Sequence, residues 1–298
     1  MAGTDHLTDR IPKFSARNHF YVPPPEFNGC FTTFFRAQLT IEDGHTISDQ
    51  LQPEWGSIRF VDGNLLTARL GDTAVTCPRF LASGPSSLPT HFEVGSSGLW
   101  GIGFLPLGWC RFLDVDARDL ANITCDGEQH PAFAKFAQLA DVLCDAEVDE
   151  QAQFEAIVDL MRRLMRETRD DEKVIGVHHA MVDETISTVS EFADASGLNI
   201  RSLERICHRY FGFTPKLLLR RQRFMRSLTT FMLLPEANWT DAMDEHYHDQ
   251  AQFTREFRMF MGMSPTEYAS LDHPLLTAFV QARARDRGSA AQTLDRPD

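Results

Sequence analysis

Two short stretches near the C-terminal end of the chain carry arginine and glutamine side chains at helical spacing. Arg201 and Arg205 lie one helical turn apart in the first stretch, and Gln252 and Arg255 lie three residues apart in the second. Arginine can make two parallel hydrogen bonds to a guanine edge, and glutamine can make two to an adenine edge. These residue types could therefore read base pairs in a major groove.

The elements that must position the first stretch form a helix-turn-helix pattern. Thr188 and Glu191 have the spacing of a capping box, which predicts the start of a helix. Gly197 can adopt the left-handed conformation of a tight turn at little cost. After the turn, apolar residues recur at helical spacing and predict a buried face, made of Leu203, Ile206, Tyr210 and Phe211. The opposite face is polar and basic, as a helix in a major groove requires.

The second stretch repeats this pattern about fifty residues further along the chain. Asp249 can cap a helix whose Phe253, Phe257 and Phe260 face inward. Both blocks close on a glycine, an apolar residue, Ser or Thr, and a proline, at 212–215 and 262–265. Two such units in tandem predict an all-α domain that reads duplex DNA.

The stretch between the two units is strongly basic. Thr214 and Pro215 predict the start of a bridging helix, as a cap followed by a first-turn proline. From residue 201 to residue 226 eight Arg and Lys residues face a single acid, Glu204, although the whole chain has a formal net charge of −13. Such a block predicts a phosphate-contacting surface. We expect four bridge residues to contact phosphates: Lys216, Arg220, Arg221 and Arg223.

Residues from about 183 to 271 resemble the DNA-binding domain of the AraC/XylS family of bacterial transcription regulators. The most specific match is Tyr247, Asp249–Phe253, Arg255–Phe257, Gly262–Pro265 and Tyr268. The resemblance implies two helix-turn-helix units, bridged by a long helix, that enter adjacent major-groove segments. It implies that the first recognition helix presents Arg201, Ser202, Glu204 and Arg205, and the second Gln250, Ala251, Gln252 and Arg255. Arg209, on the same basic face, joins the expected DNA contacts.

The second unit departs from the family pattern in two ways. His246 stands where the second turn of the family usually has glycine. Four acids also crowd this unit, namely Asp241, Asp244, Glu245 and Asp249. We therefore expect the second unit to bind DNA more weakly than the first, because acids repel phosphates.

The N-terminal part, residues 20–128, has short β-like runs separated by turns. Phe31–Thr40 alternates in part, and Ser57–Val61 runs into Asp62-Gly63-Asn64, which predicts a hairpin turn. These runs predict a small barrel or sandwich, and the family resemblance implies a cupin-like β-barrel that senses an effector. Three tryptophans are candidates for lining an effector pocket, although such residues are more often core: Trp55, Trp100 and Trp109.

The remaining segments complete an α+β chain. Residues 131–172 carry two apolar helical stripes, which either mediate homodimerisation or pack onto the barrel. The DNA-binding domain is expected at 173–271, and 272–298 is expected to be a flexible tail. The predicted partners are an operator in double-stranded DNA, a small-molecule effector and RNA polymerase.

The composition of the chain argues against secreted, membrane-spanning and metal-dependent proteins. The six cysteines show no CxxC spacing, the N-terminal residues show no pattern of a signal peptide, and no run approaches the roughly 20 apolar residues of a membrane span. These features predict a cytoplasmic protein without metal or cofactor. His19, His45 and His91 do not form the set that a metal-dependent cupin enzyme needs, so we expect no enzyme.

Two alternatives remain open. The acidic second unit would also suit a scaffold protein with degenerate helix-turn-helix units, whose DNA affinity would not fall steeply with salt. A cupin-type enzyme would hold a metal when purified.

Overall fold

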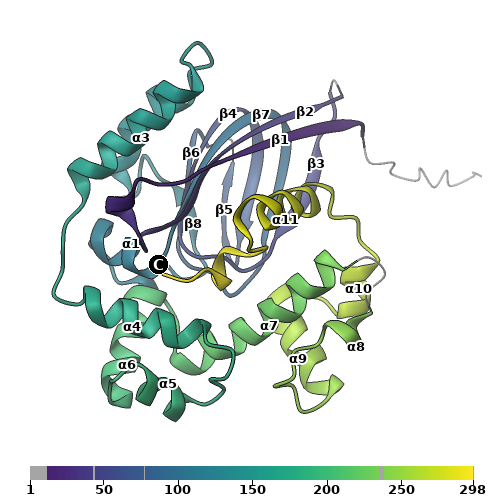
Figure 1. The fold of residues 1–298 in the computed structure, drawn as a ribbon. Helices are drawn as coiled ribbons and strands as arrows, with labels where there is room; N and C mark the ends of the chain where they lie inside the picture. The colour runs from purple at the N-terminus through teal and green to yellow at the C-terminus, as the bar shows by residue number, and fades with distance from the viewer. Residues whose placement is uncertain (1–11, 43, 77, 235–237, 298) are drawn as a thin grey trace, which may run out of the picture.

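The computed structural model describes residues 12–42, 44–76, 78–234 and 238–297, and Figure 1 shows their arrangement. The N-terminal stretch considered for a signal peptide and one of the six cysteines, Cys77, therefore lie outside the described residues. A curved antiparallel sheet forms the N-terminal half, and the helices of residues 171–269 lie below it in Figure 1. The predicted α+β order, with a β-rich part followed by helices, is confirmed.

Eight strands make a single sheet in the order β1-β2-β7-β4-β6-β8, with β3 on β7 and β5 on β4. Their bounds are β1 Phe14–Tyr21, β2 Phe31–Ile41, β3 Ile47–Leu51, β4 Ser57–Leu70, β5 Thr73–Thr76, β6 Phe80–Ser83, β7 Thr90–Phe104 and β8 Thr124–Asp126. Strands β1 and β8 stand at opposite ends of this order and do not pair within the described chain. The sheet is therefore not closed into the barrel that the family resemblance implied.

The predicted hairpin at Asp62-Gly63-Asn64 is wrong, because β4 runs straight through it. Gly63 has φ +105°, and the register of β4 on β7 shifts beside it, so the glycine marks a β-bulge. A Cβ at Gly63 would lie 2.9 Å from the carbonyl oxygen of Ser96. Residues typical of a turn thus form a bulge inside a long strand, and the sheet bends there.

The helical segment 131–172 packs onto the sheet. It contains the short helices η3 Ala134–Leu139 and α2 Ala140–Leu143 and the longer α3 Glu150–Leu164. Its apolar stripes lie in the same buried cluster as Trp100 and Phe104 of β7, and their buried members include Phe133, Phe136, Leu139, Ile157 and Met161. Of the two roles left open by the sequence, packing onto the sheet is the one observed, so these residues offer no exposed stripe for dimerisation.

The same buried cluster continues into the first helix-turn-helix unit. It includes Phe192, Leu203 and Phe211, together with residues of α1 Pro106–Phe112 and α4 Asp171–Val182. The second unit has a separate cluster of its own, built around Phe224, Tyr247, Phe253, Phe257 and Tyr268. The expected domain boundary near residue 173 therefore does not separate two cores.

Residues 272–298 were expected to be a flexible tail, but the described part folds. Helix α11, Pro274–Arg287, begins at a first-turn proline and ends at Gly288, with φ +72°. Leu276 and Val280 are buried, and α11 lies against the concave side of the sheet (Figure 1). A short helix, η5 Gln292–Leu294, follows and packs on the bridge helix. In the N-terminal half, two further small helices are η1 Pro25–Phe27 and η2 Ala117–Leu120.

None of the helices described here is long and apolar enough to span a bilayer.

One buried amide should decide how firmly α3 is held to the sheet. The Gln153 Oε1 accepts from the Trp100 Nε1 at 2.6 Å, and its Nε2 donates to the carbonyls of Val142 and Asp145 at 3.2 and 3.0 Å. Gln153→Leu would leave the buried Trp100 N–H without this partner, at about 1–3 kcal/mol. The carbonyls of Val142 and Asp145 still accept from the N–H groups of Asp145 and Val148, at 3.4 and 3.3 Å. We expect the free energy of unfolding, from urea titration, to fall by about 1–3 kcal/mol.

Gln151→Leu, in the same helix, is the matched control because Gln151 is exposed. It should change stability by no more than about 0.5 kcal/mol. Equal effects of the two substitutions would contradict this account of the α3 contact.

Candidate nucleic-acid interface

The first helix-turn-helix unit consists of α5 Val189–Ala195 and α6 Ile200–Ile206. The predicted capping box is present, with Thr188 accepting from the Glu191 backbone and Glu191 accepting from the Thr188 backbone. Gly197 has φ +65°, as the tight turn requires. Asn199 then caps α6 by accepting from the Ser202 N–H at 2.9 Å. These local bonds fix the angle between the two helices.

The first recognition helix buries one face and exposes the other. Leu203 and Ile206 are fully buried, whereas Arg201, Glu204 and Arg205 are exposed and Ser202 is half-buried. Helix α6 continues into a π-helical turn, η4 Cys207–Phe211, which ends at Gly212 with φ +85°. The residues expected to meet base edges from this unit thus share its solvent face.

Two of the predicted DNA-contacting arginines face acids of the N-terminal half. An Arg205 guanidinium nitrogen lies 3.6 Å from the Asp170 carboxylate, and Arg209 lies 3.5 Å from Asp116 and 3.8 Å from Asp170. Burial acts to raise the pKa of the Asp170 carboxyl. Hydrogen bonds from Tyr210 and Lys173 and the charge of Arg205 outweigh it, so this pKa lies below its usual range. Arg209 therefore sits at the junction with the N-terminal half, beside the expected reading surface.

The second unit consists of α8 Trp239–Ala242, α9 Gln250–Met261 and α10 Pro265–Ala269. Asp249 caps α9 by accepting from the Gln252 N–H at 2.6 Å, as its position predicted. Gln250, Ala251 and Arg255 are exposed. The Gln252 side chain is half-buried and its Oε1 accepts from the His248 N–H at 3.1 Å, so this amide already has a partner within the unit.

His246 fits its turn without a left-handed backbone, because Asn122 is the sole non-glycine residue with positive φ in the described chain. Its N–H and Nδ1 lie 3.0 and 3.1 Å from Asp244 Oδ1, and its carbonyl accepts from Arg223 at 3.2 Å. The other Asp244 oxygen accepts from Arg226 at 2.5 Å. Burial acts to raise the pKa of Asp244, but the bonds from Arg226 and His246 lower it below its usual range. The histidine thus takes part in a hydrogen-bond network with Asp244 and Arg223, at the position where the family resemblance implied a glycine.

The bridge helix α7, Pro215–Leu233, begins at the predicted Thr214 cap, which accepts from the Leu217 N–H at 3.2 Å. Much of its positive charge is paired within the chain. Arg220 and Arg223 lie 2.8 and 2.7 Å from the same oxygen of Glu256, whose side chain is 5% exposed. These two residues, expected to contact phosphates, thereby anchor α9 to α7, and Lys216 is the exposed member of the predicted set.

Arg221 occupies a different place from the one predicted. Its side chain is fully buried, its guanidinium lies 4.1 Å from the ring of Trp55, and its Nη1 donates to the Ser86 carbonyl at 3.0 Å. Burial lowers its pKa to about 9. No acid pairs with it among the described residues. Arg221 is therefore out of reach of a phosphate and instead joins the bridge helix to the N-terminal half through an aromatic ring.

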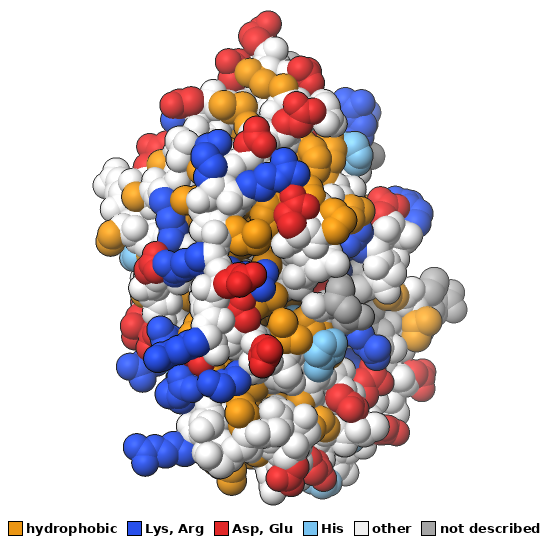
Figure 2. Space-filling view, turned by 60° about the vertical axis from the view of Figure 1, so that its left-hand side comes forward, with side chains coloured by type: hydrophobic (Ala, Val, Ile, Leu, Met, Phe, Trp, Pro, Cys, Tyr) orange, Lys and Arg blue, Asp and Glu red, His pale blue; other side chains and the backbone are white. Residues whose placement is uncertain are grey.

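A hollow of about 440 Å³ lies between the two units. Its lining comes from the loop before α5, from α7 and from α9, and includes Thr188, Lys216, Arg220, Arg226 and Gln252. Figure 2 shows another side of the molecule, on which Lys and Arg side chains gather toward the lower left while acids are spread over the whole face. Positive charge is thus local on a chain whose net charge is −13.

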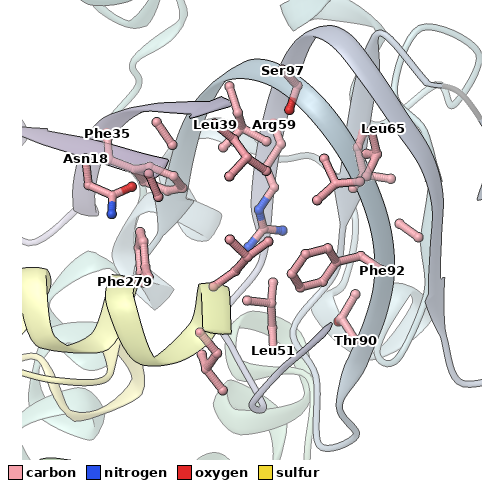
Figure 3. A pocket seen from close by; sticks show the side chains of 18 of the residues that line it. Asn18, Phe35, Leu39, Leu51, Arg59, Leu65, Thr90, Phe92, Ser97 and Phe279 are labelled. Atoms are coloured by element: carbon pink, nitrogen blue, oxygen red, sulfur yellow. The ribbon is translucent and has the colours of Figure 1, made fainter. Parts of the chain in front are cut away.

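A second, apolar cavity of about 160 Å³ lies between the concave side of the sheet and α11. Leu39, Leu65 and Phe92 line it from the sheet, Phe279 lines it from α11, and the Arg59 guanidinium reaches into it (Figure 3).

The three tryptophans proposed for an effector pocket lie elsewhere, in the buried core. Trp55 stacks against Arg221, Trp100 binds Gln153, and the Trp109 Nε1 donates to the Val115 carbonyl at 2.9 Å. The lining of the apolar cavity could not be found from composition, because it depends on the packing of α11 across the sheet.

Comparison with known proteins identifies the helical unit. Residues 192–270 match a family model described as a helix-turn-helix domain, of the AraC type. No curated protein sequence matches the chain. This match confirms the family resemblance expected from the sequence.

Similar solved structures include ToxT from Vibrio cholerae, with 11% identity, 86% of this chain and 97% of that chain covered, and a TM-score of 0.45. They also include ToxT bound to (E)-4-(8-methylnaphthalen-1-yl)but-3-enoic acid, at 10% identity, 86% and 97% coverage and a TM-score of 0.43. A third is ToxT with a bound unsaturated fatty acid, at 10% identity, 87% and 96% coverage and a TM-score of 0.38.

The salt dependence of DNA binding should separate exposed from buried bridge cations. Each phosphate contact adds about 0.9 to the slope of log affinity against log salt. We expect Lys216→Ala to lower that slope by about 1, measured by fluorescence anisotropy on a DNA duplex. Arg221→Met should leave the slope unchanged, with folding checked by circular dichroism. A slope lowered equally by Arg221→Met would mean that this side chain leaves its buried site to meet DNA.

Proposed function

We propose that this chain, which carries an AraC-type helix-turn-helix domain and is a DNA-binding transcriptional regulator, reads a two-part operator and responds to a small apolar effector. The bridge helix is the observation that supports binding to a two-part operator. Its 19 residues span about 28 Å, close to the roughly 34 Å of one DNA turn. Two recognition helices attached to one such rigid helix can enter successive major-groove segments on one face of a duplex.

The two units should contribute unequally to base reading. In the first unit Arg201 and Arg205 are exposed and can reach guanine edges. In the second unit Gln252 accepts a hydrogen bond from the His248 N–H and Asp249 caps the start of α9, while Asp241 and Glu245 add negative charge to the sequence of this unit. Binding through Gln252 must therefore replace an existing hydrogen bond, which reduces its net contribution.

Substitution of one reading residue in each unit tests this difference. Arg205→Ala should cost about 1–3 kcal/mol of operator affinity and relax one base position, because one bidentate contact is lost. Gln252→Ala should cost less. Both values come from binding isotherms on the operator and on single-base variants of it. An equal loss for both variants would contradict the weaker second unit, and no loss for Arg205→Ala on any sequence would contradict the assignment of the first helix.

The effector site that we propose is the apolar cavity between the sheet and α11. Its lining is largely apolar, and it lies outside the helix-turn-helix units, as an effector site should. We further propose a cytoplasmic location, where the chromosome is accessible, and contact with RNA polymerase on the promoter. Homodimerisation would need a surface other than the stripes of 131–172, because those residues are buried within the chain.

A scaffold role is the second candidate, and the ion pairs of the bridge helix favour it. Glu256 and Asp244 together neutralise much of the charge of Arg220, Arg223 and Arg226, which weakens the attraction for phosphates. A scaffold protein would show little DNA affinity and little salt dependence.

Capture of sheared genomic DNA by the purified chain separates the two functions. We expect fragments that share two short elements about one helical turn apart. Retention at low salt without a shared sequence would contradict sequence-specific reading. No retention at any salt would favour the scaffold role.

A further inference from the structure

The C-terminal strap, defined here as residues 273–297, connects the apolar cavity to the second helix-turn-helix unit. We propose that a small uncharged apolar molecule in the cavity holds this strap against the sheet and thereby fixes the second unit relative to the first. The inference rests on the proposed effector site, and it assigns the chemistry of the ligand and the route of its effect.

The distribution of buried residues indicates which unit can move. The first unit shares a continuous core with the sheet, through Phe192, Leu203 and Phe211. The second unit has its own small core and reaches the rest of the chain mainly through α7 and the strap. A ligand can therefore change the spacing of the two units most easily by acting on the attachment of the second.

The beginning of the strap is tied to the sheet and to the second unit at once. The Asp49 carboxylate, on β3, accepts from the N–H groups of Leu275 and Leu276, both at 2.9 Å, and its side chain is fully buried. His273 Nδ1 lies 3.4 Å from the other Asp49 oxygen, and its ring stacks on Tyr268 of α10 at 4.2 Å. One carboxylate thus fixes the start of α11 next to the core of the second unit.

The middle of the strap forms one wall of the cavity. Leu275, Leu276 and Phe279 line it. The Phe279 ring lies 5.5 Å from that of Phe20 and 5.0 Å from that of Phe35, on the two outermost strands of that edge. A molecule in the cavity would touch the sheet and α11 together, and those contacts exist only while the strap is docked.

The end of the strap continues from the cavity to the bridge helix. Arg59, which lines the cavity, donates to Glu54 at 2.5 Å, and the other Glu54 oxygen accepts from the Gln292 Nε2 at 2.6 Å. The next residue, Thr293, accepts through its carbonyl from the Gln222 Nε2 of α7 at 2.8 Å. Gln222 and Thr293 are both buried. Hydrogen bonds therefore connect the cavity to α7 through two adjacent strap residues.

The cavity also indicates the chemistry of its ligand. A volume of about 160 Å³ with apolar walls suits a molecule of about the size of benzene. Arg59, the one cation among the described residues that line the cavity, is already paired with Glu54 and also donates to Ser57 at 2.7 Å. An anionic ligand would have to break that buried pair, which is costly, whereas an uncharged ligand leaves it intact.

A ligand that binds only the docked state shifts the population toward it. At ten times its dissociation constant, such a ligand lowers the population of undocked states about tenfold. Amide hydrogens of α11 and of α10 that exchange through undocking should then exchange about tenfold more slowly.

The experiment uses the full chain with benzene as the probe and benzoate as the charged comparison. The melting temperature reports binding, and hydrogen exchange followed by mass spectrometry reports the strap and the second unit. We expect benzene to raise the melting temperature and to slow exchange over residues 264–297 and at the adjoining turns of α7, and benzoate to do neither. Ala37→Phe should abolish the benzene effect, because Ala37 lines the cavity and the larger side chain would fill it.

Two variants, Gln292→Met and Asp49→Ala, test the route by which the ligand acts. Gln292→Met removes the bond to Glu54, and Gln138→Met is its matched control at an exposed site outside the strap. In Gln292→Met, benzene should still raise the melting temperature, while its slowing of exchange across residues 288–297 and at the adjoining turns of α7 is lost. Asp49→Ala should lose the slowing in α10 and at the start of α11. Gln138→Met should behave as the parent chain in every measurement.

Each other result overturns a defined part of the proposal. A raised melting temperature without slower exchange in residues 264–287 of the parent would overturn the coupling. An effect of benzoate but not of benzene would overturn the uncharged ligand class, and no effect of either would overturn the cavity as a ligand site. None of these measurements involves DNA, so their failure is distinct from a failure to capture an operator.

Discussion

A continuous apolar core, running from the sheet into the first helix-turn-helix unit, is the constraint on which the rest of the structure depends. Residues as distant in sequence as Phe34 and Phe211 belong to it. Because protein interiors are packed as densely as crystals, a unit that shares such a core cannot shift without disturbing it. The first recognition helix is thus fixed to the N-terminal half, and freedom of movement is left to the second unit.

Electrostatics reinforce this division between the two units. At the junction of the first unit, Asp170 and Asp116 face Arg205 and Arg209, so DNA phosphates must compete with protein carboxylates for these cations. Between the units, the buried Glu256 carboxylate holds Arg220 and Arg223 and attaches α9 to α7. The basic residues of the bridge helix therefore largely form ion pairs within the chain. Its unpaired positive charge is much smaller than a count of Arg and Lys residues indicates.

The sequence predicted well those features that depend on a few neighbouring residues. The capping box at Thr188, the cap at Asp249 and the glycine turn at Gly197 are local, since each involves side chains within a few positions of the backbone they bind. Features that depend on distant partners were missed. Arginine is a residue type that contacts phosphates, but the Arg221 guanidinium packs on Trp55, which is far away in sequence. Asp62-Gly63-Asn64 has the composition of a hairpin, but its pairing with β7 makes it a bulge.

The contact between Asp49 and the start of α11 also has a consequence for how the chain is made. The two partners are separated by 226 residues, and a ribosome adds on the order of 5–20 residues per second. The strands that form the concave face therefore emerge on the order of ten seconds or more before the helix that covers them. During that interval their apolar side chains must be protected by other means, by partial collapse of the sheet or by a chaperone. The covering of this face is a late event in biosynthesis, and the long loop that it closes should make it a slow one.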